Sequence, residues 1–436
     1  MEPTVLATII LLGGMVLLLI VSVPVAVAIG LPAAAAAIVL VGFDQAALVS
    51  AQRVFAGSNS FALLAIPFFV LAGSLMNAGG MATRLIDLAL VIAGRAPASL
   101  AQTTVVANTL FGAVSGASVA SAATVGTVLG PRMKKEGYDP RFAAAVNVSA
   151  SPAGMLLPPS NTFIVYALVS SSSIAALFMA GVGPGLLWSL ACMVVVGLYA
   201  RKHPELRGKH RATLKEALLV LWRAVPSLLM IVVVVGGILA GVFTATESAV
   251  IAVVYALVFG LAKRAVKVRE LPEVVLHASR TTGIIMLLVG VSAVLSWVMS
   301  YARIPQQVSE AMLQITDSPI AILLIITLVL LIAGTVMDPT PAILIFTPIL
   351  LPIVVELGVH PVHFGVMIVF NMSLGNITPP VGNNLFVGAR VAGLRVEPVV
   401  AKMVPFFIAL TIALLVTVFW PALSMWLPTQ LGLVTP

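Results

Sequence analysis

The chain has 436 residues, of which 61% are hydrophobic and only 9% are charged. Soluble domains are typically about half apolar and about a quarter charged, so this composition excludes a soluble globular protein. The net charge of +8 arises largely from clusters of basic residues. Such clusters are typical of cytoplasmic loops in membrane proteins and do not indicate a nucleic-acid site. The single cysteine, Cys192, excludes a disulfide framework.

Several apolar stretches are long enough to cross a bilayer core of about 30 Å as helices. The first has Glu2 and no basic residue ahead of it, so we interpret it as a spanning helix rather than a cleaved signal peptide. We predict an all-α polytopic membrane protein with ten spanning helices. They cover residues 5–21, 24–42, 59–78, 141–170 and 174–200, and then 226–242, 245–263, 280–299, 362–391 and 395–421.

The second five helices repeat the first five. When the sequence is aligned with itself at an offset of 221 residues, five prolines coincide without a gap, including Pro158-Pro159 with Pro379-Pro380. Proline strongly constrains a helix, so a shared proline pattern indicates a shared architecture. We predict a first repeat over residues 1–200, a cytoplasmic linker over 201–223 and a second repeat over 224–436.

The two repeats are predicted to have opposite orientations in the membrane. The loop 132–141 has four basic residues, whereas the equivalent loop 353–362 has none. Basic loops stay in the cytoplasm, so these two loops are expected on opposite sides. An odd number of crossings per repeat produces this inversion, which many transporters share.

Each repeat also contains an apolar stretch that is interrupted near its centre. These stretches cover about 99–131 and about 318–357, and we predict that each is a re-entrant helical hairpin. After each hairpin the chain is broken again, at 152–161 and 375–384, where a double proline removes two backbone donors. Non-helical backbone at membrane depth has to be buried in protein or bind a ligand. The two tips and two unwound segments therefore predict a binding site near the middle of the membrane.

The residue types at these breaks suit ions. Hydroxyl and carbonyl oxygens are ligands for a hard cation, and helix N-termini attract anions. The candidate sodium ligands are Ser115, Ser118, Gly154, Pro158, Gly334, Asp338, Gly375, Thr378 and Gly382. The candidate substrate-binding residues are Ser115, Gly116, Ser160, Asn161, Asp338, Asn376 and Pro379.

Structural interpretations of the same residues stay open. Proline and glycine can kink helices for packing, and small residues at the tips can serve close helix contact. Asp338 can cap the second arm of its hairpin, which does not exclude ion coordination. Glu247 has the spacing of a capping box and is interpreted as structural. His360 and His363 are expected to be solvated on an outer loop rather than to bind a metal.

Five motifs span nearly the whole chain, at 63–69 with 72–73, 114–120, 157–160, 241–247 and 378–382. Together they resemble the large membrane subunit of the tripartite ATP-independent periplasmic (TRAP) transporters. The resemblance implies an elevator-type, sodium-coupled importer of the bacterial inner membrane, with sodium as the coupling ion. It also implies two protein partners, a small four-helix membrane subunit and a periplasmic substrate-binding protein.

An elevator needs a scaffold and a moving transport domain. The helices at 5–21, 24–42, 226–242 and 245–263 lack a central Pro-Pro break and are predicted to form the scaffold. Amphipathic segments that link scaffold and transport domain are predicted to lie along the membrane interface. These segments cover 43–58, 79–95, 264–279 and 300–316.

The predicted function is sodium-coupled import of a small organic acid (a carboxylate) that a periplasmic protein delivers. One alternative keeps the fold and needs no binding protein, as in divalent-anion sodium symporters, whose carboxylate-binding motif is similar to Ser160-Asn161-Thr162. A more remote alternative is a polytopic membrane enzyme. The sequence has no nucleophile elbow, HExxH motif or Walker lysine to support an enzyme.

Overall fold

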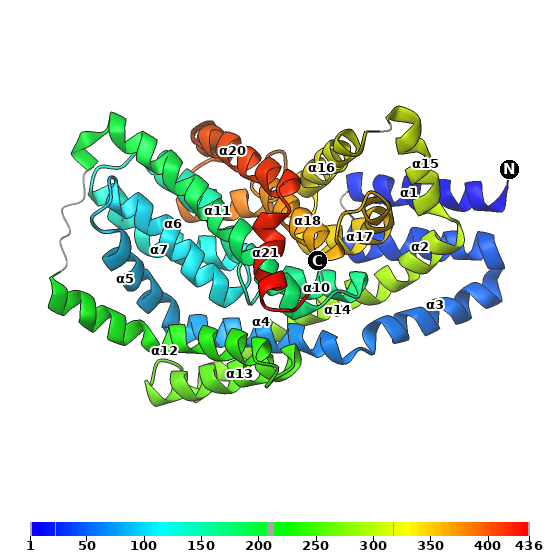
Figure 1. The fold of residues 1–436 in the computed structure, drawn as a ribbon. Helices are drawn as coiled ribbons and strands as arrows, with labels where there is room; N and C mark the ends of the chain where they lie inside the picture. Colours follow the sequence, from blue (N-terminus) through cyan, green and yellow to red (C-terminus); the bar gives the residue numbers. More distant parts are fainter. Residues whose placement is uncertain (1, 22, 207–212, 317, 435–436) are drawn as a thin grey trace.

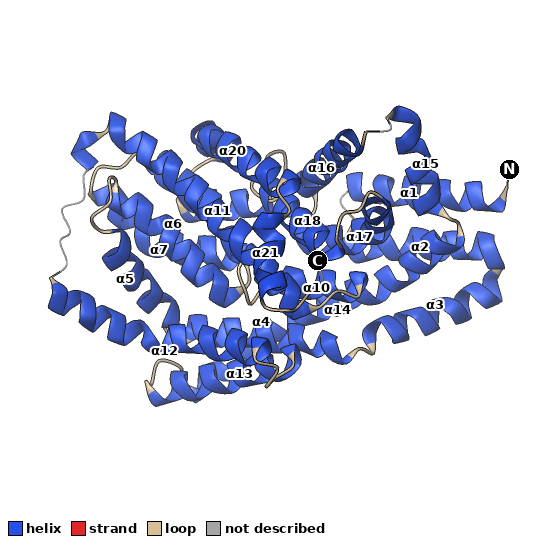
Figure 2. Ribbon diagram, viewed as in Figure 1, coloured by secondary structure: helices blue, strands red, loops and turns tan. Residues whose placement is uncertain are grey.

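The computed structural model describes residues 2–21, 23–206, 213–316 and 318–434. Within these ranges the chain consists of helices and connecting loops, without a strand (Figure 2). Nine helices in the described ranges are long and apolar enough to cross a membrane, or ten if the bent pair 140–156 and 161–170 is one span. The prediction of an all-α polytopic membrane protein is confirmed.

The described residues of the first half of the chain form thirteen helical segments. They are α1 (Pro3–Ile20), α2 (Val25–Val41), α3 (Phe43–Ser58), η1 (Phe61–Leu64), α4 (Ala65–Ala78), α5 (Met81–Ala93), α6 (Ser99–Ser115), α7 (Ser118–Lys135), α8 (Pro140–Ala150), α9 (Ala153–Leu156), α10 (Asn161–Ser170), α11 (Ile174–Lys202) and η2 (Pro204–Leu206).

Eleven helical segments lie in the described part of the second half. They are α12 (Leu214–Leu239), α13 (Ala245–Ala262), η3 (Val268–Glu270), α14 (Leu271–Tyr301), α15 (Ile304–Ile315), α16 (Pro319–Val336), α17 (Pro339–Glu356), α18 (Pro361–Gly375), α19 (Asn383–Val391), α20 (Val396–Phe419) and α21 (Ala422–Gln430).

Local sequence explains where many of these helices begin and end. Helix α2 ends at Gly42, whose φ of +80° suits a residue without a Cβ. Helix α13 begins with a capping box in which Thr244 and Glu247 exchange backbone hydrogen bonds. The structural interpretation of Glu247 is therefore confirmed.

Two helix pairs flank two inner helices, α4 and α14. Helices α1 and α2 pack together and α2 packs against α14, whereas α12 and α13 pack together and α13 packs against α4. Each pair thus contacts the inner helix of the opposite half, and the two pairs lie well apart in Figure 1. The outer face of α12 is apolar and exposed, as at Trp222 and Val232, which suits contact with lipid or with another membrane protein.

One of the four predicted linking segments is wrong. Separate helices α3, α5 and α15 occupy three of them, but residues 271–279 of the segment 264–279 are the first turns of α14. The physical reason is local. Pro272 sits in the first turn of the helix, where proline favours helix initiation, and no further proline interrupts the chain before Pro305.

The remaining helices form a densely packed body with the largest buried side chains of the described chain. Trp188 of α11 and Phe370 of α18 have ring centroids 4.9 Å apart, and the Trp188 indole donates a hydrogen bond to the carbonyl of Ser149 (2.9 Å). The Tyr166 hydroxyl donates to the carbonyl of Pro361 (2.6 Å). First-half helices α8, α10 and α11 are in this way interleaved with second-half helices α18 and α20.

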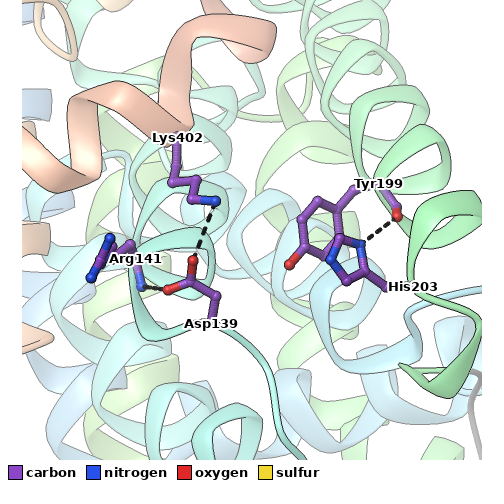
Figure 3. A network of polar contacts seen from close by, with 5 residues as sticks. All are labelled: Asp139, Arg141, Tyr199, His203 and Lys402. Atoms are coloured by element: carbon purple, nitrogen blue, oxygen red, sulfur yellow. Dashed lines mark hydrogen bonds and ion pairs between the residues drawn. The ribbon is translucent and has the colours of Figure 1, made fainter.

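An ion pair adds a polar link between the halves. Lys402 of α20 lies 3.3 Å from the carboxylate of Asp139, which also caps α8 by accepting from the backbone N–H of Arg141 (Figure 3). Beside it the rings of Tyr199 and His203 are stacked, with centroids 4.0 Å apart. The ion pair connects α20 to α8, and Phe142 of α8 stacks on Tyr199 of α11 with ring centroids 3.5 Å apart. These contacts lie at the end of the molecule where the basic residues of the 132–141 loop gather.

Candidate functional site

The first hairpin turns where glycine permits it. Helix α6 ends at Ser115, Gly116 has a φ of +62°, and α7 begins at Ser118. One helical turn earlier, Gly112 is so close to Gly154 of α9 that a Cβ on either residue has no room. The first hairpin therefore packs directly against the first unwound segment.

The second hairpin packs against the second unwound segment in a similar way. Gly334 of α16 contacts Gly375 at the end of α18, again without room for a Cβ on Gly375. The carbonyl of Thr335 accepts hydrogen bonds from the backbone N–H groups of Val381 (3.2 Å) and Gly382 (3.1 Å). The second tip and the second unwound segment are therefore in direct contact.

The two halves meet at this point. A Cβ on Gly116 would lie 3.2 Å from the carbonyl oxygen of Pro159 and 3.3 Å from the amide nitrogen of Asn161. On the other side of the first tip, the Asn376 side chain donates to the hydroxyl of Ser118 (3.3 Å). The structure thus places the first tip against both unwound segments, and not only against the segment of its own half.

Helix ends converge on this cluster. Helices α7, α10, α17 and α19 begin at the tips or just after the unwound segments, and α6, α16 and α18 end there. A helix N-terminus carries partial positive charge and unpaired N–H groups, and a C-terminus carries unpaired carbonyls. The cluster therefore offers donors to an anion and neutral oxygens to a cation.

Among the candidate residues, Asn376 has a buried side chain with an unpaired polar atom. It is only 2% exposed, and its carbonyl oxygen Oδ1 has no hydrogen-bond partner. A buried polar atom without a partner is costly in free energy. A bound ion or substrate would remove that cost.

Three other candidates have their hydroxyl groups engaged locally. The Ser160 hydroxyl is fully buried and donates to the carbonyl of Met155. The Thr378 hydroxyl donates to the carbonyl of Leu374 (2.7 Å), and Ser115 stays within the tip turn, 3.4 Å from the backbone of Ala117. Their oxygens keep lone pairs with which they could contact a cation.

Asp338 is the charged residue at the second tip. It directly precedes α17, is exposed, and its side chain makes no cap hydrogen bond. The other candidates contribute backbone to the cluster: Gly154, Pro158, Gly334, Gly375, Pro379 and Gly382, with the Pro158-Pro159 and Pro379-Pro380 bonds both cis. No group of three or more His, Cys, Asp or Glu side chains within the described ranges could hold a metal ion.

Sequence reasoning missed a buried amide network beside the first tip. Asn108 of α6 donates to the Asn147 carbonyl (3.0 Å) and accepts from the Ser121 hydroxyl (2.8 Å), while Asn147 donates to the carbonyl of Ala122 (2.7 Å). The network ties both arms of the hairpin to α8. Polar residues inside apolar stretches are the signal that could have identified it.

The expectation that His363 is solvated is wrong. This residue is 2% exposed, and its ring nitrogens lie 2.6 Å from the Ser424 hydroxyl and 3.3 Å from the carbonyl of Val418. The chain turns back after α20, so α21 covers the first turn of α18. Local sequence contained no sign of this long-range contact.

Known proteins are similar to this chain in sequence and in fold. The model of the family "Tripartite ATP-independent periplasmic transporter, DctM component" matches residues 12–423. An uncharacterized protein, YgiK, of Salmonella typhimurium is 46% identical over 422 residues, 97% of each chain. The C4-dicarboxylate TRAP transporter large permease protein DctM of Pseudomonas aeruginosa is 39% identical over 384 residues, 88% of this chain and 90% of its own.

A solved structure shows a related fold at low identity. The crystal structure of the YdaH transporter of Alcanivorax borkumensis matches with a TM-score of 0.63 and 14% identity, over 90% of each chain. Its likeness therefore concerns the fold alone.

These matches define the class of the protein as a polytopic transport protein of the inner membrane and exclude a membrane enzyme. The chain belongs to the DctM family, the large permease subunits of TRAP transporters. The resemblance noted from the sequence motifs is confirmed.

Proposed function

We propose that this permease imports a small organic carboxylate by sodium-coupled secondary transport. The observation that carries the proposal is the meeting of the first hairpin tip with the second unwound segment at Asn376, beside the N-termini of α7 and α19, whose N–H groups are donors for a carboxylate. The unpaired Oδ1 of Asn376 is an acceptor, so it suits a cation or a substrate hydroxyl. The relative from Pseudomonas aeruginosa is named for C4-dicarboxylates, which supports a carboxylate as the substrate class.

Sodium fits the donors that the structure brings together. Within the described ranges no group of His, Cys, Asp or Glu side chains suits a transition metal. What the breaks supply are hydroxyl and carbonyl oxygens, which a hard cation prefers. We assign one sodium site to each half, formed by a hairpin tip and the unwound segment beneath it: Ser115, Ser118, Gly154 and Pro158 in the first, and Gly334, Asp338, Gly375, Thr378 and Gly382 in the second.

The family description names a tripartite, periplasmic transporter. We infer that this permease acts with a small membrane subunit and with a soluble periplasmic protein that delivers the substrate. The exposed apolar face of α12 suits contact with the small subunit. The alternative of a symporter without a binding protein has no separate observation in its favour.

Movement is proposed as an elevator. The densely packed body, with its hairpins, carries the substrate, and the outer pairs α1/α2 and α12/α13 with α4 and α14 form the scaffold (Figure 1). Alternating access then requires rigid-body sliding of one body past the other. The opposite orientation of the two repeats is part of this proposal.

The experiment is uptake of a radiolabelled carboxylate, beginning with succinate, into proteoliposomes that contain the permease and its small subunit. Sodium and the periplasmic protein are added separately and together. We expect uptake only when both are present and the sodium gradient points inward. Sodium-independent uptake would contradict the coupling, and full uptake without the periplasmic protein would favour the simpler symporter.

A further inference from the structure

A cavity of about 360 Å³ lies away from the hairpin tips, near the basic end of the first hairpin. Helices α7, α8 and α19 form its walls, and Thr104 of α6 belongs to its floor. Its volume falls in the range of small-molecule sites, roughly 300–1,000 Å³. The lining is mainly glycine, alanine and other apolar residues, and the residue at its mouth is Lys134.

Most polar side chains of the lining are already hydrogen-bonded to the protein. The Thr104 hydroxyl donates to the carbonyl of Leu100 (2.8 Å), and the Thr127 hydroxyl donates to that of Ala123 (2.7 Å). Asn147 donates to Ala122 and accepts from Asn108. A water cluster would therefore find few free partners, and buried waters usually need about three. An apolar ligand therefore fits the lining of the cavity better than water does.

The charge at the mouth is positive and has no partner. Lys134 is exposed, and across the described ranges the one ion pair joins Lys402 to Asp139, which leaves Lys134 unpaired. Arg132 and Lys135 lie next to it on α7, and the nearest acid in the sequence, Glu136, is exposed in the following loop. An anionic group at the mouth would gain a charge-assisted contact.

We propose that this cavity binds an alkyl chain that ends in an anionic group, with the chain between α7 and α19 and the anion at Lys134. A free fatty acid and an anionic phospholipid share this chemistry. The ligand contacts both α7, whose first residue is Ser118, and α19, which follows the unwound segment of Asn376. It therefore stabilises the contact between α7 of the first half and α19 of the second.

Glycine positions allow a clean test of the cavity. Gly130 lines the cavity and a Cβ there meets nothing within 4 Å, so Gly130→Leu should narrow the cavity without a clash at its Cβ. Lys134→Gln removes the charge and leaves the walls unchanged. Gly283→Leu on α14 is the matched control, because a Cβ there also meets nothing within 4 Å.

The experiment uses the full-length permease in phosphatidylcholine nanodiscs with three photoreactive probes. These are a diazirine-bearing fatty acid, a phosphatidylglycerol with the same group in one acyl chain, and a neutral alkanol of equal length. Labelled positions are located by peptide mass spectrometry. We expect an anionic probe to label the peptides around Gly126–Gly130 and Gly388–Val391. Whichever anionic probe labels them more strongly identifies the source of the ligand.

Labelling of these peptides should fall about tenfold in Gly130→Leu and in Lys134→Gln, which corresponds to about 1.4 kcal/mol, and should persist in Gly283→Leu. Equal labelling in wild type and Gly130→Leu would overturn the site. Equal labelling by the neutral probe, unchanged in Lys134→Gln, would overturn its preference for an anion. The readout is binding, so it is independent of whether the proposed transport is observed.

Discussion

Asn376 is a buried amide whose two polar atoms are in different situations. The nitrogen donates to Ser118, while the oxygen has no partner in the described chain. Asn147 is also buried, but both of its polar atoms are paired. The comparison distinguishes the residue that we propose binds a ligand from a residue that holds the fold together.

Asn376→Leu should reduce apparent substrate affinity about 10- to 100-fold, because the second N–H of its amide nitrogen, the one not donated to Ser118, can donate to a carboxylate, and this is the loss expected for a hydrogen bond to a charged group. Thermal unfolding should change little, because the variant also removes an unpaired buried oxygen. Asn147→Leu should lower the free energy of unfolding by about 1–3 kcal/mol. Uptake kinetics and thermal unfolding of both variants are the measurements. Normal uptake by Asn376→Leu with a loss of stability equal to that of Asn147→Leu would contradict the assigned roles.

Substitution of Thr378 tests sodium binding at the scale of a single residue. Its hydroxyl donates to the carbonyl of Leu374, four residues earlier, so its lone pairs remain for a cation. Thr378→Ala should raise the sodium concentration for half-maximal uptake, and Thr378→Ser should restore it. Thr417→Ala on α20 is the control, since that hydroxyl makes the same kind of bond to Ala413. Unchanged sodium dependence in both Thr378→Ala and Ser118→Ala would exclude these hydroxyls as ligands.

At the scale of elements, the two hairpins follow from local backbone chemistry. Gly116 adopts a positive φ at the first tip, and Pro339 begins α17 just after the second. Such residues act on their immediate neighbours, so the sequence alone was enough to predict the breaks. The same holds for the capping box of Glu247.

Contacts between distant segments could not be predicted in this way. The bond between Asn376 and Ser118 joins residues 258 positions apart, and that between His363 and Ser424 joins residues 61 apart. Nothing in the local pattern specifies such pairs. The continuous helix α14 was missed for a different reason, because charged residues at its start were interpreted as a separate interfacial segment.

The loops at the bases of the hairpins test the predicted inversion of the repeats. Glu136 follows α7 and Glu356 is the last residue of α17, and both are exposed. Glu136→Cys should react with an impermeant thiol reagent only from the cytoplasmic side, and Glu356→Cys only from the periplasmic side. The native Cys192 is buried, so background labelling should be low. Reaction of both cysteines from one side would refute the inverted repeat.

At the scale of the whole molecule, the helix contacts distinguish the densely packed body, called the inner body below, from the proposed scaffold. Leu198 of α11 and Ile408 of α20 are exposed positions on the inner body, and Leu229 of α12 is exposed on the scaffold. Helix α11 packs against α20 and α18, whereas α12 packs against α13 and α5. The two groups are therefore expected to move as separate bodies.

Spin labels on cysteines at these positions test the elevator. The distance distribution between 198 and 229 should change when sodium and substrate are added, while that between 198 and 408 should not. Pulsed electron paramagnetic resonance on the permease in nanodiscs is the measurement. Uptake with an unchanged distance between 198 and 229 in every condition would argue against sliding.

The central claim is that the hairpin tips and unwound segments that meet near Asn376, with the helix N-termini that begin there, form the carboxylate site. Val381 lies within that cluster, and its side chain is exposed while its backbone N–H bonds to Thr335. In Val381→Cys, the rate of modification by an anionic methanethiosulfonate reagent should fall about tenfold when sodium and the carboxylate identified by the uptake assay are both present. Leu198→Cys on the outer face of α11 should react at an unchanged rate. Equal modification rates at position 381 with and without sodium and substrate would contradict the account.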